Sequence, residues 1–382
     1  MTAFEPTEDQ RAIGALAREI AAREIAPHVA AWDREHTFPR ALYTQLGAAG
    51  LMGILVPEAY GGSGADYVSY ALMIEEIARV DAGAATTISV HSMICNAIAK
   101  LGNDEQRERW LGDLATNDAL AGFALTEPDA GSDAAAIRSR AVRDGDAYVL
   151  NGRKQWCTNG GHAAVVMAMF RTSDAGAKGI SAFLIDTSLA GVDVEKVTEK
   201  LGIHTSNTVD LAFTEVRVPA AALIGAEDAG LSSALTTLAA GRIGIAAQAT
   251  GILGACLDAS AKFAKERVAF GRPIGAFEGI AFKLAQMATD LDAARLLTYR
   301  AAALCDAGKP FAIEASKAKL FASTAARVHA SEAVQIHGGY GYTTEFPVER
   351  YYRDAKITEI YEGTSEIQQL IIARDLVGRL DA

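Results

Sequence analysis

The sequence predicts an α+β protein, in which an all-helical N-terminal domain, a middle β-domain and a C-terminal helical bundle follow one another along the chain. Two changes in pattern indicate this order. Apolar residues recur at helical spacing up to about residue 120 and again after Gly230. Between these regions the helical spacing disappears, and short runs rich in β-branched and aromatic residues alternate with turn signals. We therefore predict domains at residues 1–120, 121–228 and 229–382.

Composition excludes several classes of function. The chain has 382 residues and a formal net charge of −11, which argues against non-specific binding of nucleic acid. Its four cysteines show no C-x-x-C spacing, so neither a disulfide framework nor a metal site is expected. The first residues lack the pattern of a signal peptide, and no uncharged apolar run is long enough to span a membrane. We expect a cytoplasmic protein.

The first third reads as a series of helices. The helical pattern covers residues 8–32, with a bend or end at Pro27, and then 39–52, 66–80, 84–101 and 104–116. The glycine-rich loop at residues 57–64 lacks the spacing of a phosphate-binding loop, and no strand precedes it. We interpret this loop as a plain connection.

The middle region reads as at least six short strands. They are expected at residues 122–126, 147–156, 164–171, 180–185, 192–197 and 209–216. Turn signals separate them, such as Arg143-Asp144-Gly145-Asp146. The pair Asn151-Gly152 predicts a type I′ hairpin turn.

The last third predicts an antiparallel four-helix bundle. Its long alanine-rich helices are expected at residues 231–267, 276–307 and 310–335, with a fourth after residue 365. Ser365 and Gln368 have the spacing of a capping box that starts this last helix. Glu362 lies just before that start, where free backbone N–H groups can hold a carboxylate. The alternative interpretation is an ordinary solvated loop glutamate.

Two stretches of the β-domain favour a flat polar ligand. Thr126 and Ser132 lie in a Pro/Gly turn at residues 123–133, although a plain surface turn has the same composition. Trp156 and Thr158 are two residues apart on a strand, so they should share a face. An aromatic plane with a hydroxyl beside it suits a conjugated ring. The alternative is a tryptophan in the core.

Two helix ends in the last third could contact a ligand. Arg267 and Arg272 flank a helix end, where Gly271 can adopt the left-handed conformation and Pro273 stops the helix. The arginines could bind a pyrophosphate or simply complement the helix dipole. The glycines at 338, 339 and 341 would let backbone approach a ligand closely. A catalytic role is one interpretation of His337, but we expect it to be a capping or packed residue.

Six stretches are informative through their order and spacing, and they lie at residues 125–133, 156–160, 241–248, 267–273, 335–339 and 361–365. Together they resemble the acyl-CoA dehydrogenase family over essentially the whole chain. The resemblance implies that family's fold, with a β-barrel-like middle domain. It also implies a homotetramer, as a dimer of dimers, with FAD between the middle domain and the C-terminal bundle.

The resemblance implies a role for each matching residue. Glu362 would be the catalytic base that removes the α-proton of an acyl-CoA, giving a trans-2-enoyl-CoA, while FAD takes the β-hydrogen and passes electrons to an electron-transfer flavoprotein. Substrate would contact Ser132, Arg242, Tyr361 and Gly363. FAD would contact Phe123, Leu125, Thr126, Gly131, Ser132, Trp156, Thr158, Phe270, Thr364 and Glu366, and, from a neighbouring subunit, Arg267, Gln335, Gly338 and Gly339. We expect a short straight or branched acyl group.

Two positions depart from the family pattern. Glu278 stands where many members have glutamine, and its charge would repel a diphosphate. Ala239 stands where many members have an acidic residue, which removes a contact to the pantetheine part of the substrate and argues against a base on this helix. The alternatives are an acyl-CoA oxidase, a flavin monooxygenase of the same scaffold, or a scaffold protein without flavin.

Overall fold

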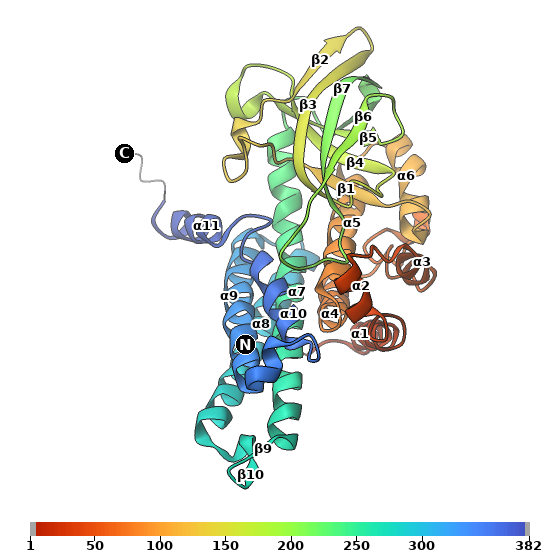
Figure 1. Cartoon of the computed structure of the whole chain (residues 1–382). Coiled ribbons are helices and arrows are strands. Elements are labelled where there is room, and N and C mark those ends of the chain that lie inside the picture. Colours follow the sequence, from red (N-terminus) through yellow and green to blue (C-terminus); the bar gives the residue numbers. More distant parts are fainter. Residues whose placement is uncertain (1–4, 379–382) are drawn as a thin grey trace.

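Three groups of elements follow one another along the chain, and Figure 1 shows the sheet stacked at one end of two sets of helices. The computed structural model describes residues 5–378. The N-terminal helices are α1 (Glu8–Ile20), α2 (Val29–Glu35), α3 (Arg40–Ala48), α4 (Tyr67–Ala78), α5 (Ala82–Leu101) and α6 (Asp104–Thr116). The C-terminal helices are α7 (Gly230–Glu266), α8 (Glu278–Asp306), α9 (Ala312–His337), α10 (Val348–Ile357) and α11 (Ser365–Val377). The predicted order of helices, sheet and helices is confirmed.

The first predicted helix is divided. A capping box between Thr7 and Gln10 starts α1, which buries Gly14, Ala17 and Ile20 on one face. A single π-helical turn at Ala21–Ile25 follows, and α2 begins beyond Pro27. Proline cannot donate the backbone hydrogen bond that a continuous helix would need there.

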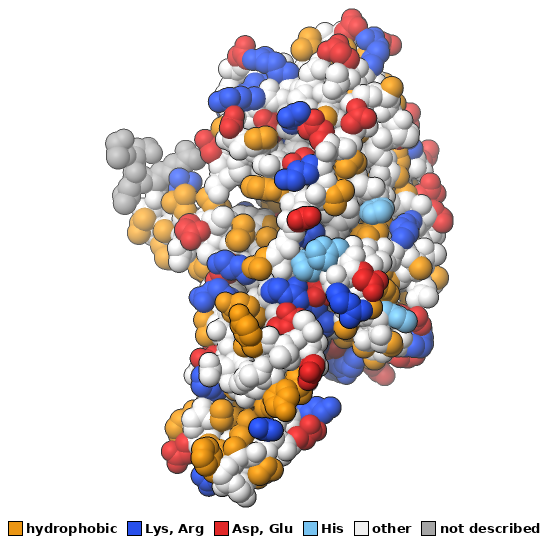
Figure 2. Space-filling model, in the orientation of Figure 1, with side chains coloured by type: hydrophobic (Ala, Val, Ile, Leu, Met, Phe, Trp, Pro, Cys, Tyr) orange, Lys and Arg blue, Asp and Glu red, His pale blue; other side chains and the backbone are white. Residues whose placement is uncertain are grey.

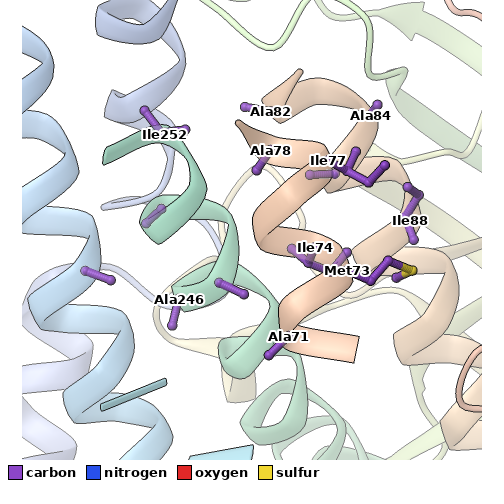
Figure 3. Close-up of a cluster of buried hydrophobic side chains, with 14 of the residues drawn as sticks. Ala71, Met73, Ile74, Ile77, Ala78, Ala82, Ala84, Ile88, Ala246 and Ile252 are labelled. Carbon is purple, nitrogen blue, oxygen red and sulfur yellow. The ribbon is translucent and has the colours of Figure 1, made fainter. Parts of the chain in front are cut away.

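Helix α7 is the spine of the molecule. It has 37 residues and packs against α4, α5, α8 and α9. Figure 3 shows α7 beside α4, with Ala246 and Ile252 of α7 and Ala71, Ile74 and Ala78 of α4 in the same buried cluster. By length and composition α7 could cross a membrane, but 83% of its most apolar window is buried inside the protein, as expected for a core helix.

Glycines in α7 allow α4 to approach closely. A Cβ atom on Gly251 would lie 2.4 Å from the carbonyl oxygen of Glu75, and one on Gly244 would lie 2.3 Å from the hydroxyl of Tyr70. Both distances are shorter than any real contact of that kind. The spacing of the two helices therefore depends on hydrogen in place of a side chain at these positions.

The middle region forms an eight-stranded sheet. Its strands are β1 (Ala121–Ala124), β2 (Arg140–Asp144), β3 (Ala147–Thr158), β4 (Val165–Arg171), β5 (Ile180–Asp186), β6 (Val192–Val197), β7 (Thr208–Pro219) and β8 (Leu223–Ile224). The order is β6-β7-β3-β2-β4-β5-β8, and β1 pairs with β4 in parallel. Sequence reasoning missed β2, because Ala141 is its only buried residue.

The predicted hairpin turn at Asn151-Gly152 is wrong. Both residues lie inside β3, where the register with β7 shifts between Leu150 and Gly152. The shift is a bulge, and a Cβ atom on Gly152 would lie 2.1 Å from the hydroxyl of Ser139. The glycine therefore serves a close approach inside a strand.

A hairpin with the left-handed turn lies elsewhere. Strands β9 (Val268–Ala269) and β10 (Arg272–Pro273) pair directly after α7. Their turn consists of Phe270 and Gly271, with φ values of 50° and 77°. Positive φ at both central residues is the requirement of a type I′ turn. Gly271 is left-handed as predicted, but it belongs to this hairpin and does not cap the helix.

The end of the chain differs from the predicted bundle in two ways. Helix α10, which packs on α9 and α7, was not predicted, since two of its four buried residues are the charged Arg350 and Asp354. Helix α11 projects from the bundle (Figure 1), and Gln368 is its one buried residue in the described part. Its N-cap is Thr364, so the predicted cap at Ser365 is wrong by one residue.

The connection between β6 and β7, residues 198–207, ties the sheet to both sets of helices. The backbone N–H of Ile203 donates to the carboxylate of Asp354 in α10 at 2.5 Å. The hydroxyl of Thr205 donates to Asp81 at 2.8 Å, and Asp81 also caps α5. Burial raises the pKa of Asp354 to about 7. Buried carboxylates on two helical layers thus hold one loop of the sheet domain.

The packing of α7 on α4 gives a stability prediction. We expect Gly251→Ala to lower the melting temperature, because overpacking of this kind costs about 1–3 kcal/mol. Gly112 in α6 is the matched control, since a Cβ atom there would meet nothing within 4 Å. Gly112→Ala should leave the melting temperature unchanged or raise it, because alanine favours helix by up to about 1 kcal/mol. Equal melting temperatures of Gly251→Ala and wild type, by thermal unfolding, would contradict the close approach.

Candidate active site

Glu362 lies in the turn between α10 and α11, and its side chain points back at α7. Its backbone is left-handed, with a φ of 52°. A Cβ atom on Gly241 would lie 2.4 Å from Oε2 of Glu362 and 2.8 Å from the sulfur of Met93. Both carboxylate oxygens are buried and have no hydrogen-bond partner among the described residues. The solvated-loop interpretation of Glu362 is therefore wrong.

The surroundings of this carboxylate control its protonation. Burial raises the pKa of Glu362 to about 7, and the charges of Arg242 and Lys319 act in the opposite direction. Arg242 in α7 is 5% exposed, and its guanidinium donates to the hydroxyl of Ser316 at 3.3 Å. A carboxyl group with a pKa near neutrality can accept a proton at physiological pH. The geometry thus suits a general base.

The residues beside Glu362 are held in place. The hydroxyl of Tyr361 donates to the side chain of Gln248 and lies 3.4 Å from the hydroxyl of Thr86. Thr364 caps α11 by accepting from the backbone N–H of Ile367 at 3.4 Å. Glu366 is exposed, and a hydrogen bond with Thr364 lowers its pKa. Tyr361, Glu362 and Gly363 therefore sit on a fixed turn, as the sequence predicts for the start of a helix.

The turn that carries Thr126 and Ser132 is built on a buried ion pair. Lys154 is 0% exposed and donates to Glu127 at 2.7 Å. Glu127 also accepts from the backbone N–H groups of Arg138 and Ser139, at 2.6 and 3.1 Å. The ion pair and these two hydrogen bonds hold together the two ends of the loop at residues 125–139. Sequence reasoning missed it, although a lysine on a buried strand was the available signal.

The strand that carries Trp156 is irregular at that residue. Trp156 has a φ of 55° and is 58% exposed, and its backbone N–H donates to Asp210 at 3.1 Å. The core-tryptophan interpretation is therefore wrong. The register with β7 shifts between Lys154 and Cys157, so the simple alternation that placed Trp156 and Thr158 on one face does not hold.

The remaining predicted β-domain residues lie around the same edge of the sheet. Phe123 is half-buried in β1, and Leu125 is 8% exposed with its carbonyl facing Lys154. Gly131 and Ser132 are exposed at the tip of the loop. The backbone carbonyl of Thr126 accepts from the backbone N–H of Gln155 at 2.7 Å, which fixes the loop against β3.

A second group of predicted residues lies far from Glu362. Arg267, Phe270, Gln335, Gly338 and Gly339 are exposed near the ends of α7 and α9, at the bottom of Figure 1. Phe270 is 96% exposed, and the space-filling view in Figure 2 shows apolar side chains gathered at this end. The 25 residues of α7 that separate Arg242 from Arg267 span about 37 Å at 1.5 Å per residue. One chain does not bring the two groups together.

Three further positions have ordinary structural explanations. His337 is buried, stacks on Phe263 at 4.3 Å between ring centres, and contacts the carbonyl of Ala333, so it is packed as expected. Glu278 is the first residue of α8, where its charge complements the helix dipole. Ala239 is buried within α7, on the turn before Arg242.

Comparison with known proteins covers nearly the whole chain. Residues 7–118, 122–216 and 228–377 match the N-terminal, middle and C-terminal domains of acyl-CoA dehydrogenase. An acyl-CoA dehydrogenase of Bacillus subtilis is 48% identical over 97% of this chain and 99% of its own length. The mitochondrial short-chain specific acyl-CoA dehydrogenase of Mus musculus is 45% identical over 98% of this chain and 91% of its own length.

Two solved structures superimpose over nearly the full length. Butyryl-CoA dehydrogenase from Megasphaera elsdenii has a TM-score of 0.97 and 42% identity, over 98% of this chain and all of that one. A chain from the structure reported for the electron transferring flavoprotein of Acidaminococcus fermentans has a TM-score of 0.97 and 43% identity, over 99% of this chain and all of that one. With its three domains matched in order and a buried carboxylate placed against α7, this chain belongs to the acyl-CoA dehydrogenase family.

Proposed function

We propose that this acyl-CoA dehydrogenase converts a short straight or branched acyl-CoA into its trans-2-enoyl-CoA, with Glu362 as the base and FAD as the cofactor. One observation carries the proposal. The carboxylate of Glu362 is buried beside α7 with no hydrogen-bond partner among residues 5–378, so its oxygens are available to a ligand. A carboxylate that is buried and unpaired costs stability, which is typical of a group retained for chemistry.

Proton removal needs a base of matched strength. The α-proton of a thioester is weakly acidic, and a base whose pKa burial raises to about 7 binds that proton more tightly than an exposed glutamate would. Negative charge then develops on the thioester oxygen. The backbone N–H of Glu362 makes no hydrogen bond within the described part of the chain, and we assign it to that oxygen. Bound FAD supplies the acceptor for the β-hydrogen as hydride.

The edge of the sheet domain fits a flat ring. The left-handed backbone at Trp156 turns its side chain out of the core. The ion pair of Glu127 and Lys154 fixes Leu125 and Thr126 nearby. Phe123, Gly131, Ser132 and Thr158 complete this edge, and we propose that they hold the isoalloxazine ring. Thr364 and Glu366 would contact the same cofactor from the start of α11.

The space beside the base favours a short acyl group. Met93 of α5 and Glu362 meet over Gly241, and Tyr70 of α4 and Ser89 of α5 fill the space over Gly244, one turn along α7. An acyl tail passing Glu362 therefore meets large side chains early. The short-chain and butyryl-CoA dehydrogenases described above support the same range. Arg242 and Gly363 lie beside the base, and Ser132 would contact the CoA side.

The distance between the two groups of cofactor residues supports an oligomer. Arg267, Phe270, Gln335, Gly338 and Gly339 are too far from Glu362 to reach the same FAD within one chain, so we propose that they bind the FAD of a neighbouring copy. A homotetramer built as a dimer of dimers provides such neighbours. We further propose a cytoplasmic location and an electron-transfer flavoprotein as the electron acceptor.

The alternatives fit less well. A flavin monooxygenase of this scaffold would not need a buried base, and a scaffold protein without catalysis would not retain an unpaired carboxylate in its interior. An acyl-CoA oxidase would keep the base. Timing the reoxidation of reduced enzyme in air separates the oxidase from the dehydrogenase, and slow reoxidation is expected.

The base is tested by Glu362→Gln. We expect turnover of butyryl-CoA to fall by at least about 10², because the amide cannot accept the proton, while bound flavin per subunit stays the same. Glu108→Gln on the exposed face of α6 is the control and should keep full turnover. Near-normal turnover of Glu362→Gln would place the base elsewhere.

The substrate range is tested at Met93. Met93→Ala should raise kcat/KM for octanoyl-CoA relative to butyryl-CoA by about tenfold, since pocket discrimination of this kind is worth about 1–3 kcal/mol. Met93→Leu keeps the side-chain volume and should keep the wild-type preference. An unchanged ratio in Met93→Ala would show that other side chains limit the pocket.

The shared cofactor site is tested by mixing two inactive variants. Co-expressed Glu362→Gln and Arg267→Ala subunits should form mixed dimers in which one of the two sites combines an intact Glu362 with an intact Arg267. Activity should therefore return in doubly tagged, purified mixed oligomers. If these oligomers are as inactive as the two parents, each site belongs to a single chain.

A further inference from the structure

Lys319 of α9 is a buried cation whose hydrogen bond goes to a neutral group. It is 0% exposed, and its Nζ donates to the backbone carbonyl of Gly363 at 2.8 Å. Burial of an ammonium group is costly unless nearby negative charge compensates it. Glu362 is the strongest such charge acting on Lys319, ahead of Glu359 and Glu366. The free-energy cost of burying Lys319 is explained if its positive charge stabilises the ionised carboxylate of Glu362.

The carbonyl of Gly363 is held from two helices at once. Besides Lys319 of α9, the side-chain amide of Gln368 in α11 donates to it at 2.8 Å and to the carbonyl of Glu362 at 3.3 Å. Gln368 is also 0% exposed. Two successive residues of this turn have positive φ values, 52° at Glu362 and 93° at Gly363. A glutamate with positive φ is strained, so external bonds are needed to keep it there.

One face of α9 organises both cations of the site. Ser316, which accepts from Arg242, lies three residues before Lys319, so the two side chains are neighbours on the helix. Within residues 5–378, the other titratable groups on which the charge of Glu362 acts include the hydroxyls of Tyr70 and Tyr361. Glu359 is engaged by Arg327 and Lys356, and Glu366 points to Thr364. Among residues 5–378, this leaves Lys319 as the cation that also bonds to the turn carrying the base, through the carbonyl of Gly363.

We propose that Lys319 is a positioning residue for the reaction: its ammonium fixes the turn that carries Glu362 and keeps that carboxylate ionised near neutral pH. The inference rests on the proposed role of Glu362 as the base. Loss of the positive charge makes ionisation of Glu362 harder. Because the base must be ionised to accept a proton, the pH at which activity rises must move upward.

The test is the pH dependence of flavin reduction by butyryl-CoA, measured in single turnovers of the purified holoenzyme. In Lys319→Met, which removes both charge and donor, the acid limb should move up by about one pH unit or more, and the rate at its plateau should fall about tenfold. Lys319→Gln keeps a donor without charge, so its limb should move equally while its plateau falls less. Lys319→Arg keeps the charge, so its limb should stay close to that of wild type.

Lys317 provides the control on the same helix, since it is partly exposed and pairs with Glu314. Lys317→Met should reproduce the wild-type profile. An acid limb of Lys319→Met and Lys319→Gln that coincides with wild type would overturn the inference. If Lys319→Met does not retain flavin, the comparison of Lys319→Gln with Lys319→Arg decides the matter. Near-normal flavin reduction by Glu362→Gln would instead overturn the proposed function itself.

Discussion

One carboxylate pressed against the backbone of a helix determines much of this structure. For the oxygens of Glu362 to lie beside α7, residue 241 must have no side chain, because a Cβ atom there would overlap them. The turn must also adopt a left-handed conformation, which the cap of α11 and the bonds to Gly363 maintain. An unpaired buried carboxylate opposes folding, so the rest of the protein must supply the stability that it removes.

That stability comes from the packing around α7. Its small residues let α4, α5, α8 and α9 approach from several sides, and the core in Figure 3 is made of alanine, isoleucine and methionine side chains. The same helix carries Arg242 beside the base and ends in the hairpin with Arg267 and Phe270. Helix α7 therefore sets the distance between the region around Glu362 and the region around Arg267, which our proposal assigns to two separate FAD molecules.

The sequence predicted the order of elements well, because long helices and strands leave a clear period in their apolar residues. Sequence patterns failed to predict elements that bury charged residues or very few apolar ones. Helix α10 buries Arg350 and Asp354, and β2 buries a single alanine, so neither shows the expected pattern. Asn151-Gly152 has the residues of a turn but serves a bulge, and the turn of that type occurs at Phe270-Gly271, where phenylalanine gives no such signal.

The site was predicted only in part for a related reason. Glu362 alone looked like a loop residue, and the resemblance to a family singled it out. Neither Lys154 nor Lys319 lies in one of the six stretches that carry the resemblance. The place of Lys154 on a buried strand is its only signal, and the sequence does not show that the ammonium of Lys319 is buried. Their partners, Glu127 and Gly363, are 27 and 44 residues away along the chain, so only the folded structure brings them together.

The loop at residues 198–207 has a consequence for how ligands enter. Its bonds to Asp354 and Asp81 fasten the sheet to two separate helical layers, and both carboxylates lie in the interior. A rigid-body movement of the sheet away from the helices would expose Asp354 and Asp81 to solvent and break the hydrogen bonds that they accept. We therefore expect a ligand to reach Glu362 through local movement of side chains and loops, while the sheet stays attached to both helical layers.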